Sequence, residues 1–330
     1  MAALGSISIE EIRAARERIA GTAVRTPLLR LHVEDGPGEI WLKLENLQPI
    51  GSFKLRGAGN AMALASPEQL ANGVYTASAG NMAQGVAWNA RRLGIPCRVV
   101  VPDHAPETKL AAIERLGGEV VKVPFDDWWR VIVTHEYPGM EGYFIHPVCD
   151  PAVIAGNGTI GLEILEDLPD VDTIIVPYGG GGLSAGIASA LRSEQPDARV
   201  FACEVETAAP FAASLAAGEP REVEYVPSFV DGIGGKSVLP EMWPLVSKLL
   251  AGSLVVSLAE VAAAIRLLAE RCRVIAEGAG AASVAAALSA RSWSAQGALG
   301  QAGGSKVVCV VSGGNIDAAK LATILAGELP

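Results

Sequence analysis

Short apolar segments alternate with helix-like segments along this chain, and the alternation restricts the folds open to it. The strand-like segments are rich in Val and Ile and apolar throughout, rather than alternating between polar and apolar residues. Parallel strands that helices cover on both faces have this character. The pattern therefore predicts an α/β fold with right-handed crossovers between its strands. The strand-like segments are WLKLE, GVYTAS, CRVVVP, EVVKVP, TIIVPYG, RVFACEV and KVVCVVS.

Helix-like segments occupy the intervals between these strands. Ser8 and Glu11 are spaced as a capping box, which predicts a first helix that ends near Ala20. A surface loop is expected at residues 295–304. The other helix-like segments are MAQGVAWNARRLG, PETKLAAIERLG, PAVIAGNGTIGLEILEDL, LSAGIASALRSE, LAEVAAAIRLLAERC and the Ala-rich stretch after Gly280.

Composition narrows the class of protein further. The 330 residues, half of them apolar, suffice for one large domain or two linked domains. A net charge of -10 argues against non-specific binding of nucleic acid. The five cysteines are widely spaced and form no CxxC pair, so we expect buried, reduced thiols. No apolar run reaches the roughly 18 residues of a membrane span, and the N-terminus lacks a secretory apolar core, so a cytoplasmic protein is predicted.

A glycine-rich turn at residues 178–186 follows one of the predicted strands and begins a helix. Its consecutive glycines let the backbone approach a ligand closely, and the N–H groups and helix dipole favour an anion, most often phosphate. A tight turn alone needs only one or two glycines. Phosphate binding is therefore predicted for Gly179, Gly180, Gly181 and Gly182.

The same turn has a second interpretation. Gly180, Gly182 and Ala185 fit a dinucleotide fingerprint loosely, and Glu204 follows at about the distance expected for a ribose contact. On this segment alone, a nicotinamide-dependent oxidoreductase remains an alternative.

Two further strand-to-helix turns carry small polar residues. In TASAGNMAQG, Ser78, Gly80 and Asn81 would stand at a helix N-terminus, which suits a carboxylate as well as an ordinary cap. In VVSGGNID, Ser312 would stand at the C-terminal end of a strand, where ligands gather in open α/β sheets.

Lys54 gives these turns a common purpose. It lies in SFKLRGAGN among small and apolar residues, and such surroundings lower the pKa of an amine, so that it can act as a nucleophile. A phosphate-bearing aldehyde would use the lysine, the glycine turn, the carboxylate-sized turn and the serine together. The four parts therefore point to pyridoxal 5′-phosphate as the cofactor.

The motifs SFKLRGA, SAGNMAQG, VPYGGGGL and SGGN, in this order, resemble the threonine dehydratase and serine racemase family of fold-type II pyridoxal-phosphate enzymes, in the tryptophan synthase β superfamily. FIHPVCDPAVIAGNGT and VDGIGGK are similar to that family too, so the resemblance covers nearly the whole chain. It implies that Lys54 bonds covalently to the cofactor, that Asn81 contacts the cofactor's 3′-oxygen and that Ser312 meets its ring nitrogen. The implied cofactor-binding residues are Phe53, Lys54, Asn81, Gly179, Gly180, Gly181, Gly182, Leu183 and Ser312. The implied substrate-binding residues are Ser78, Ala79, Gly80 and Asn81.

The resemblance also implies an architecture and an assembly. We expect two open, twisted, mostly parallel sheets flanked by helices. Residues 1–65 and 151–330 would form a large cofactor-binding domain, and residues 66–150 a small domain that closes over the substrate. A homodimer or higher homo-oligomer is expected, and the partner is a small amino-acid substrate rather than nucleic acid or membrane.

The activity implied is a dehydratase, or ammonia-lyase, that converts a β-hydroxy amino acid of the threonine or serine type to a 2-oxoacid and ammonia. The alternatives within this cofactor class are a β-replacement synthase and a dehydratase for 3-hydroxyaspartate or a bulkier 3-hydroxy amino acid. A nicotinamide oxidoreductase built on the Gly180 turn would leave Lys54 and the SGGN turn without a role. Intact Lys54 counts against a cofactor-binding protein that has lost catalysis.

Some positions depart from the family pattern. Ala79 stands where the racemases have a proton-donating serine, which argues against racemisation, and Met82 replaces the usual histidine, which leaves the substrate open. Pro210 stands where metal-dependent members have an aspartate, so no metal site is expected. Glu204 and the carbonyl of Ala208 are the only metal ligands of the family pattern that the sequence retains here. The sequence ends soon after the SGGN helix, so feedback control through the C-terminal regulatory domain of the biosynthetic threonine dehydratases is not expected.

Three other residues stand out. Trp128 and Trp129 form an aromatic pair, for which a helix with one buried face is favoured over a substrate pocket. Glu277, in EGAGA, matches a family position near the cofactor ring, and a role in helix entry and a direct electronic role are both retained.

Overall fold

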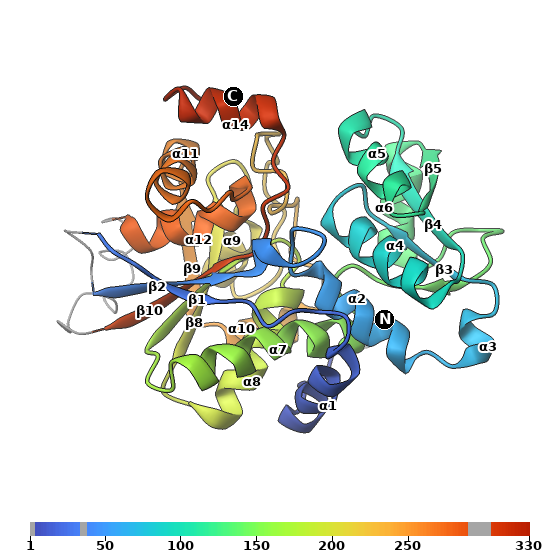
Figure 1. Ribbon diagram of the computed structural model, residues 1–330, viewed down its shortest axis with the longest axis horizontal. Coiled ribbons are helices and arrows are strands. Elements are labelled where there is room, and N and C mark those ends of the chain that lie inside the picture. The colour runs from blue at the N-terminus through green and yellow to red at the C-terminus, as the bar shows by residue number, and fades with distance from the viewer. Residues whose placement is uncertain (1–3, 34–37, 290–304) are drawn as a thin grey trace.

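Two β-sheets, each covered by helices, organise the chain in the computed structural model (Figure 1). The structure describes residues 4–33, 38–289 and 305–330, and the loop predicted at residues 295–304 lies outside them. The large sheet has the strand order β1-β2-β10-β7-β8-β9, and the small sheet has the order β5-β4-β3-β6. Within the described residues every pairing is parallel except that of β1 with β2. The predicted α/β fold with two mostly parallel sheets is confirmed.

The strands have the following bounds. In the large sheet they are β1 (Leu28–Leu31), β2 (Glu39–Leu44), β7 (Thr173–Pro177), β8 (Arg199–Val205), β9 (Gly252–Val256) and β10 (Lys306–Val311). In the small sheet they are β3 (Val74–Ala77), β4 (Cys97–Pro102), β5 (Glu119–Val123) and β6 (Tyr143–Phe144). All seven predicted strands are present, whereas β1, β6 and β9 were not predicted.

Helices cover both faces of the large sheet, as its apolar strands require. On one face lie α11 (Leu258–Leu267), α12 (Gly278–Leu288) and α14 (Ala318–Leu325), and on the other lie α1 (Ile9–Ile19), α7 (Pro151–Asp167), α8 (Gly182–Glu194) and α10 (Trp243–Leu249). Strand β10 contributes to both cores, with Cys309 buried on one side and Val310 on the other. The remaining large-sheet elements are α9 (Pro210–Ala217), the 3-10 turn Glu45–Leu47 and the π-helical turn Leu268–Cys272.

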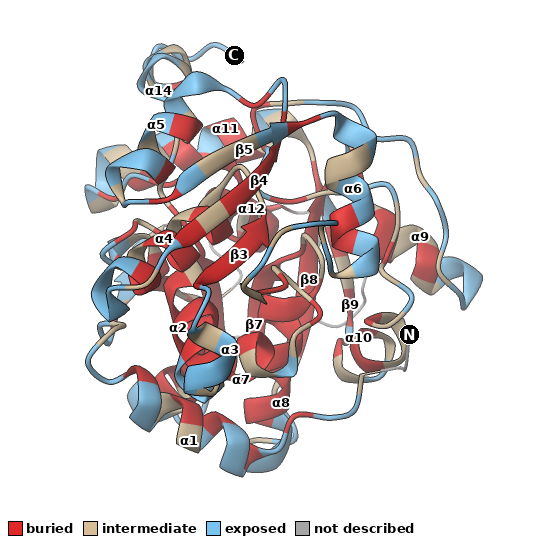
Figure 2. Ribbon diagram, turned by 90° about the vertical axis from the view of Figure 1, so that its right-hand side faces the viewer, coloured by how far each residue is buried: buried red, intermediate tan, exposed pale blue. Residues whose placement is uncertain are grey.

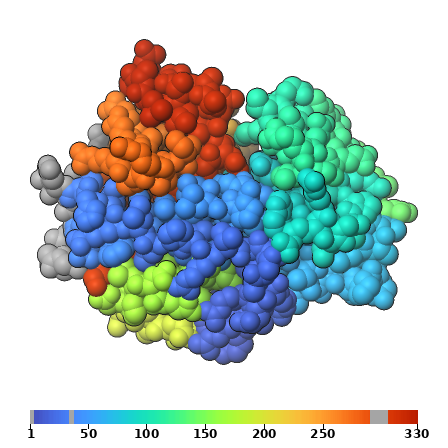
Figure 3. Space-filling model, in the orientation of Figure 1, coloured from blue at the N-terminus to red at the C-terminus, as the bar shows by residue number. Residues whose placement is uncertain are grey.

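The small sheet has its own helices, and its buried strands are visible in Figure 2. Helices α2 (Lys54–Leu64), α4 (Asn81–Leu93) and α5 (Glu107–Arg115) pack on one face, and α6 (Phe125–Thr134) packs on the other. The short α3 (Pro67–Leu70) connects α2 to β3. Figure 3 shows a notch between the C-terminal residues, in red, and the small-sheet residues, in green. The domain boundary near residue 66 remains a prediction.

Local signals account for several helix ends. Ser8 accepts a hydrogen bond from the backbone of Glu11, and the Glu11 carboxylate accepts one from the backbone of Ser8, so the predicted capping box is confirmed. Gly181, with a φ of 93°, adopts the left-handed conformation that begins α8. In the described part of the chain, no helix has both the length and the apolar character needed to cross a bilayer.

Glycines bring three helices into backbone contact. A Cβ atom on Gly156 of α7 would stand 2.6 Å from the carbonyl oxygen of Arg56 and 2.8 Å from the Cα of Gly57, both in α2. On the opposite side of α7, a Cβ on Gly158 would stand 2.9 Å from the carbonyl oxygen of Gly186 in α8. We call these contacts the two glycine seams. They fix α2 and α8, which begin at Lys54 and at the glycine turn, against one common helix.

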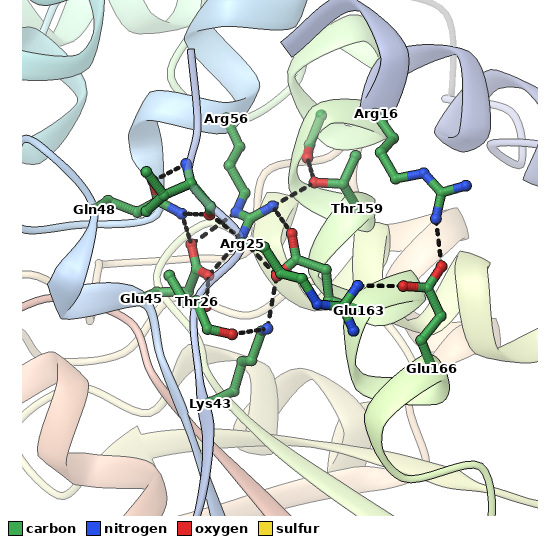
Figure 4. A network of polar contacts seen from close by, with 12 residues as sticks. Arg16, Arg25, Thr26, Lys43, Glu45, Gln48, Arg56, Thr159, Glu163 and Glu166 are labelled. Carbon is green, nitrogen blue, oxygen red and sulfur yellow. Dashed lines mark hydrogen bonds and ion pairs between the residues drawn. The ribbon is translucent and has the colours of Figure 1, made fainter. Parts of the chain in front are cut away.

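A buried charge network lies beneath the start of α2 (Figure 4). Arg56 donates to both oxygens of Glu45, at 2.8 Å each, and to both oxygens of Glu163, at 2.6 and 2.9 Å. Lys43 Nζ donates to Glu163 at 2.6 Å and to the carbonyl of Thr26. Two cations and two carboxylates therefore balance in a site where no side chain is more than 7% exposed. The network joins β2, the 3-10 turn, α2 and α7.

Candidate active site

A cavity of about 470 Å³ collects the predicted site residues, from both sheets and from loops that follow their strands. Ser78 follows β3 and Ser312 follows β10, while the glycine turn joins β7 to α8. Parallel strands present their C-terminal ends at one edge, which explains why motifs far apart in sequence meet here. Every residue predicted to bind cofactor or substrate lines this cavity, Leu183 included, whereas Glu204 and Ala208 do not.

Lys54 is the first residue of α2, and its side chain reaches into the cavity. Its Nζ donates a hydrogen bond to the carbonyl of Pro147 at 2.8 Å and lies 5.2 Å from the ring centre of Phe53. Burial lowers the pKa of the Lys54 amine to about 8. At pH 7 about a tenth of this amine is therefore uncharged, far more than for a lysine of ordinary pKa, and the uncharged form is the nucleophile.

The glycine turn presents unused backbone donors. Among the described residues, no hydrogen bond is donated by the amides of Gly179, Gly180 or Gly181. A Cβ on Gly180 would stand 2.6 Å from both methyl carbons of Val148, so a side chain has no room there. With the N-terminus of α8 directly behind, these amides form an anion site. The amine and this anion site together fit a phosphate-bearing aldehyde.

The turn after β3 offers a second set of donors. Gly80 is the N-cap of α4 and lacks a side chain that could cap the helix, so the first amides of α4 are open to a ligand. The Ser78 hydroxyl accepts a hydrogen bond from the Gly80 amide at 3.2 Å, which shapes the turn. Ala79 contributes only a methyl group, so this side of the cavity offers no proton donor at that position.

Asn81 belongs to a polar chain across the cavity. Its Nδ2 donates to Glu277 at 2.8 Å, and Asn315 Nδ2 donates to its Oδ1 at 2.7 Å. Burial, with a smaller contribution from the charge of Asp231, raises the pKa of the Glu277 carboxyl to about 7, against the opposing effect of the Asn81 hydrogen bond. Glu277 thus lines the cavity as well as standing at the N-cap of α12. Asn315 was not singled out from the sequence.

Ser312 is buried and lies between the strand end and Lys54. Its carbonyl accepts a hydrogen bond from the amide of Phe53 at 3.0 Å, which joins β10 to the segment that precedes Lys54. The hydroxyl is neutral, so the cavity has no carboxylate at this position.

Glu204 is committed elsewhere. Its carboxylate accepts hydrogen bonds from the amides of Phe211 and Ala212, both at 2.8 Å, and from the hydroxyl of Ser253. It therefore caps the first turn of α9 and is unavailable for the ribose contact considered from the sequence. No group of three or more acidic, His or Cys side chains suited to a metal occurs in the part of the chain that the structure describes.

Trp128 and Trp129 border the cavity, although the sequence favoured a helix with one buried face over a substrate pocket. Trp128 and Trp129 are on α6, as expected of a helix, but both line the cavity together with Phe125. Helix α6 packs over the small sheet close to the strand ends, and one of its faces is turned towards the site. Sequence spacing alone cannot show which face of a helix borders a cavity.

Comparison with known proteins places the chain in a family. A family model described as "Pyridoxal-phosphate dependent enzyme" matches residues 19–313, and the chain belongs to that family. Its cofactor is therefore pyridoxal 5′-phosphate, in agreement with the amine and anion site described above.

Among characterised relatives, an L-threonine ammonia-lyase of Thermotoga maritima is 42% identical over 316 residues, which cover 94% of this chain and 76% of the relative. The catabolic L-threonine dehydratase TdcB of Escherichia coli K12 is 40% identical, with 96% of each chain covered. Among solved structures, a maize serine racemase has a TM-score of 0.85 at 33% identity, covering 97% of this chain and 98% of its own. The resemblance inferred from the motifs is confirmed.

Proposed function

We propose that this protein is a pyridoxal-phosphate-dependent ammonia-lyase that converts a β-hydroxy amino acid of the threonine or serine type to a 2-oxoacid and ammonia. The observation that carries the proposal is the placement of the low-pKa amine of Lys54 in one cavity with the four-glycine turn. The names of the 40–42% identical relatives support the same reaction class.

The chain's own residues have distinct tasks in this proposal. The amides of residues 179–182 hold the cofactor phosphate, and the turn from Ser78 to Asn81 holds the substrate carboxylate. Lys54 takes the proton from the substrate Cα. The bound cofactor withdraws electrons from that carbon. The neutral hydroxyl of Ser312, which the family resemblance assigns to the cofactor ring, would stabilise negative charge there less than a carboxylate would, and this would favour loss of the β-hydroxyl group.

Ala79 supports elimination over racemisation, although racemases are among the structural relatives. Inversion at Cα requires a proton donor on the face opposite Lys54. The methyl group of Ala79 lines the cavity and cannot supply that proton.

The spectrum of the purified protein tests this proposal. We expect a near-visible absorption band from the lysine-bound cofactor, which L-threonine or L-serine perturbs while ammonia is released. Lys54→Ala should lose both the band and the turnover, whereas Lys248→Ala, at an exposed position of α10, should keep both. A protein that stays colourless with added pyridoxal phosphate, or near-normal turnover by Lys54→Ala, would refute the assignment.

The proposal includes the cellular location and the oligomeric state of the protein. The described cysteines are all free thiols, and four of the five are buried, which supports a reducing, cytoplasmic environment. A homodimer or higher homo-oligomer is proposed from the family resemblance. Light scattering on the purified protein would test it, and a monomeric mass would refute it.

A further inference from the structure

An aromatic wall, formed by Phe125, Trp128 and Trp129 of α6, borders the cavity. The ring centres of Phe125 and Trp128 are 5.4 Å apart, and those of Trp128 and Trp129 are 6.2 Å apart, so the rings form one continuous surface. Phe125 and Trp129 are 40% and 38% exposed, although both are large and apolar. Apolar surface left open beside a binding site commonly marks a contact for a ligand.

The aromatic wall is close to the turn that is proposed to hold the substrate carboxylate. Trp128 packs against the buried cluster that contains Ala77, and Ala77 is the residue directly before Ser78. Met82, at the start of α4, also borders the cavity, and its apolar side chain is buried in the adjoining small-sheet core. A substrate whose carboxylate lies at this turn therefore has an apolar surface beside its side chain.

The charges around the cavity argue against an acidic substrate side chain. Among the described lining residues, Lys109 is already paired with Asp231, at 2.9 Å between Nζ and Oδ2. His104 lies 3.2 Å from the carboxylate of Asp103. A second substrate carboxylate would thus find Lys109 already compensated and would approach the negative charge of Asp231. 3-Hydroxyaspartate fits this environment poorly.

We infer, resting on the proposed function, that the preferred substrate is a 3-hydroxy amino acid with a bulky apolar group on Cβ, and that Phe125 and Trp129 hold this group. 3-Phenylserine represents the class. Its Cα–H and Cβ–O bonds break, and the hydroxyl leaves as water. The resulting enamine takes up a proton at Cβ and loses one from nitrogen to become an imine, and water then displaces the amine, so that phenylpyruvate and ammonia are the products. The water released by elimination balances the water consumed by hydrolysis. One phenylserine therefore gives one phenylpyruvate and one ammonia, and the change needs no oxidant or reductant.

Steady-state kinetics of the holoenzyme test the inference. We expect kcat/KM for L-threo-3-phenylserine to exceed the values for L-threonine, L-serine and 3-hydroxyaspartate by about tenfold or more, the scale on which apolar pockets discriminate. Trp129→Ala and Phe125→Ala should each lower the ratio of phenylserine to threonine by about tenfold, and Trp129→Phe should keep most of it. Val133→Ala, an exposed position on α6 that does not line the cavity, should leave the ratio unchanged.

The outcomes separate this inference from the proposed function. If threonine or serine is the best substrate and the alanine variants do not change the ratio, the aromatic wall does not select the substrate, while the lyase assignment stands. If no β-hydroxy amino acid releases ammonia although the cofactor band is present, the proposed function itself fails. A preference for 3-hydroxyaspartate would overturn the inference and show that the charges of the cavity have been misjudged. Thermal unfolding of each variant, with its cofactor absorbance, shows that the ratio is measured on folded holoenzyme.

Discussion

Arg56→Met is the substitution that should reveal most about the buried charge network. In the native protein the guanidinium donates to both carboxylates, to Thr159 Oγ1 and to the carbonyl of Val24. Methionine fills similar volume but donates nothing. Glu45 then keeps only hydrogen bonds from uncharged groups, and one buried negative charge is left without compensation.

The charge imbalance sets how much stability Arg56→Met should lose. Removing one partner of a buried ion pair costs about 3–5 kcal/mol, because the remaining charge stays buried. This loss of stability depends on pH through the ionisation of Glu45. Burial alone would raise the pKa of Glu45, but the charge and hydrogen bonds of Arg56 hold that pKa below its usual value. Without Arg56 the pKa should rise, so the carboxyl can be protonated in mild acid. The loss should be largest above about pH 6 and smaller near pH 4.5.

Urea unfolding followed by circular dichroism measures this loss, and a double variant tests the reasoning. Arg56→Met combined with Glu45→Gln removes one cation and one anion, and leaves the Lys43–Glu163 pair, which is neutral overall and has a 2.6 Å contact. We expect the double variant to recover at least about 2 kcal/mol of the loss. If it is as unstable as the sum of the two single variants, charge imbalance is not the cause.

Further predictions concern individual side chains. Glu277→Gln should remove a pH dependence of stability. The Glu277 carboxyl has a pKa of about 7 in the folded protein, against 4.5 when unfolded, so the stability of the wild type falls as the pH rises between these values. Between pH 4.5 and 8, the free energy of unfolding of the variant should therefore rise by roughly 3 kcal/mol relative to that of the wild type, as measured by urea unfolding. Gly180→Ala should weaken pyridoxal phosphate binding at least about tenfold in a fluorescence titration, and adding Val148→Ala should restore part of it; equal affinity of Gly180→Ala and wild type would contradict the close-approach argument. Glu204→Ala should lower the free energy of unfolding by about 2 kcal/mol, because the N-terminal cap of α9 is lost. Mg²⁺ should not shift the melting temperature of the wild type, because the Glu204 carboxylate already accepts hydrogen bonds from Ser253 and two amides.

Much of the fold was predictable because its central strands carry an unambiguous local signal. Strands such as KVVCVV are buried on both faces, so almost every residue is apolar. The strands that were missed lack this signal. Strand β1 is an edge strand with only Leu31 buried, β9 alternates between buried and more exposed residues, and β6 has two residues. Helix α2 was not predicted as a helix because it contains Gly57 and Gly59, which weaken helix propensity and are explained by tertiary contacts alone.

The site was predictable to the extent that its residues lie in turns after strands. The ends of parallel strands meet at one edge, so the residue pattern could bring the glycine turn, the turn after β3 and Ser312 together. Lys54, at the start of α2, was joined to them by the chemistry of a phosphate-bearing aldehyde. The partners of these residues were not predictable in the same way. Lys43 and Glu163 are 120 residues apart, and Lys43 in WLKLE gives no sign that its ammonium is fully buried. Likewise, only the packing of α6 shows that Trp129 borders the cavity.

The two glycine seams make the spacing of the catalytic groups a property of the backbone. Helix α2 brings Lys54 to the cavity and helix α8 brings the anion site, and each touches α7 through main-chain atoms. Side chains elsewhere in the core can change in size over evolution and shift the helices they separate. At Gly156 and Gly158 the helices meet with no side chain of those two residues between them that could grow or shrink. The distance between amine and phosphate site is therefore insulated from sequence drift, and the cavity's substrate end can diversify around a fixed chemical centre.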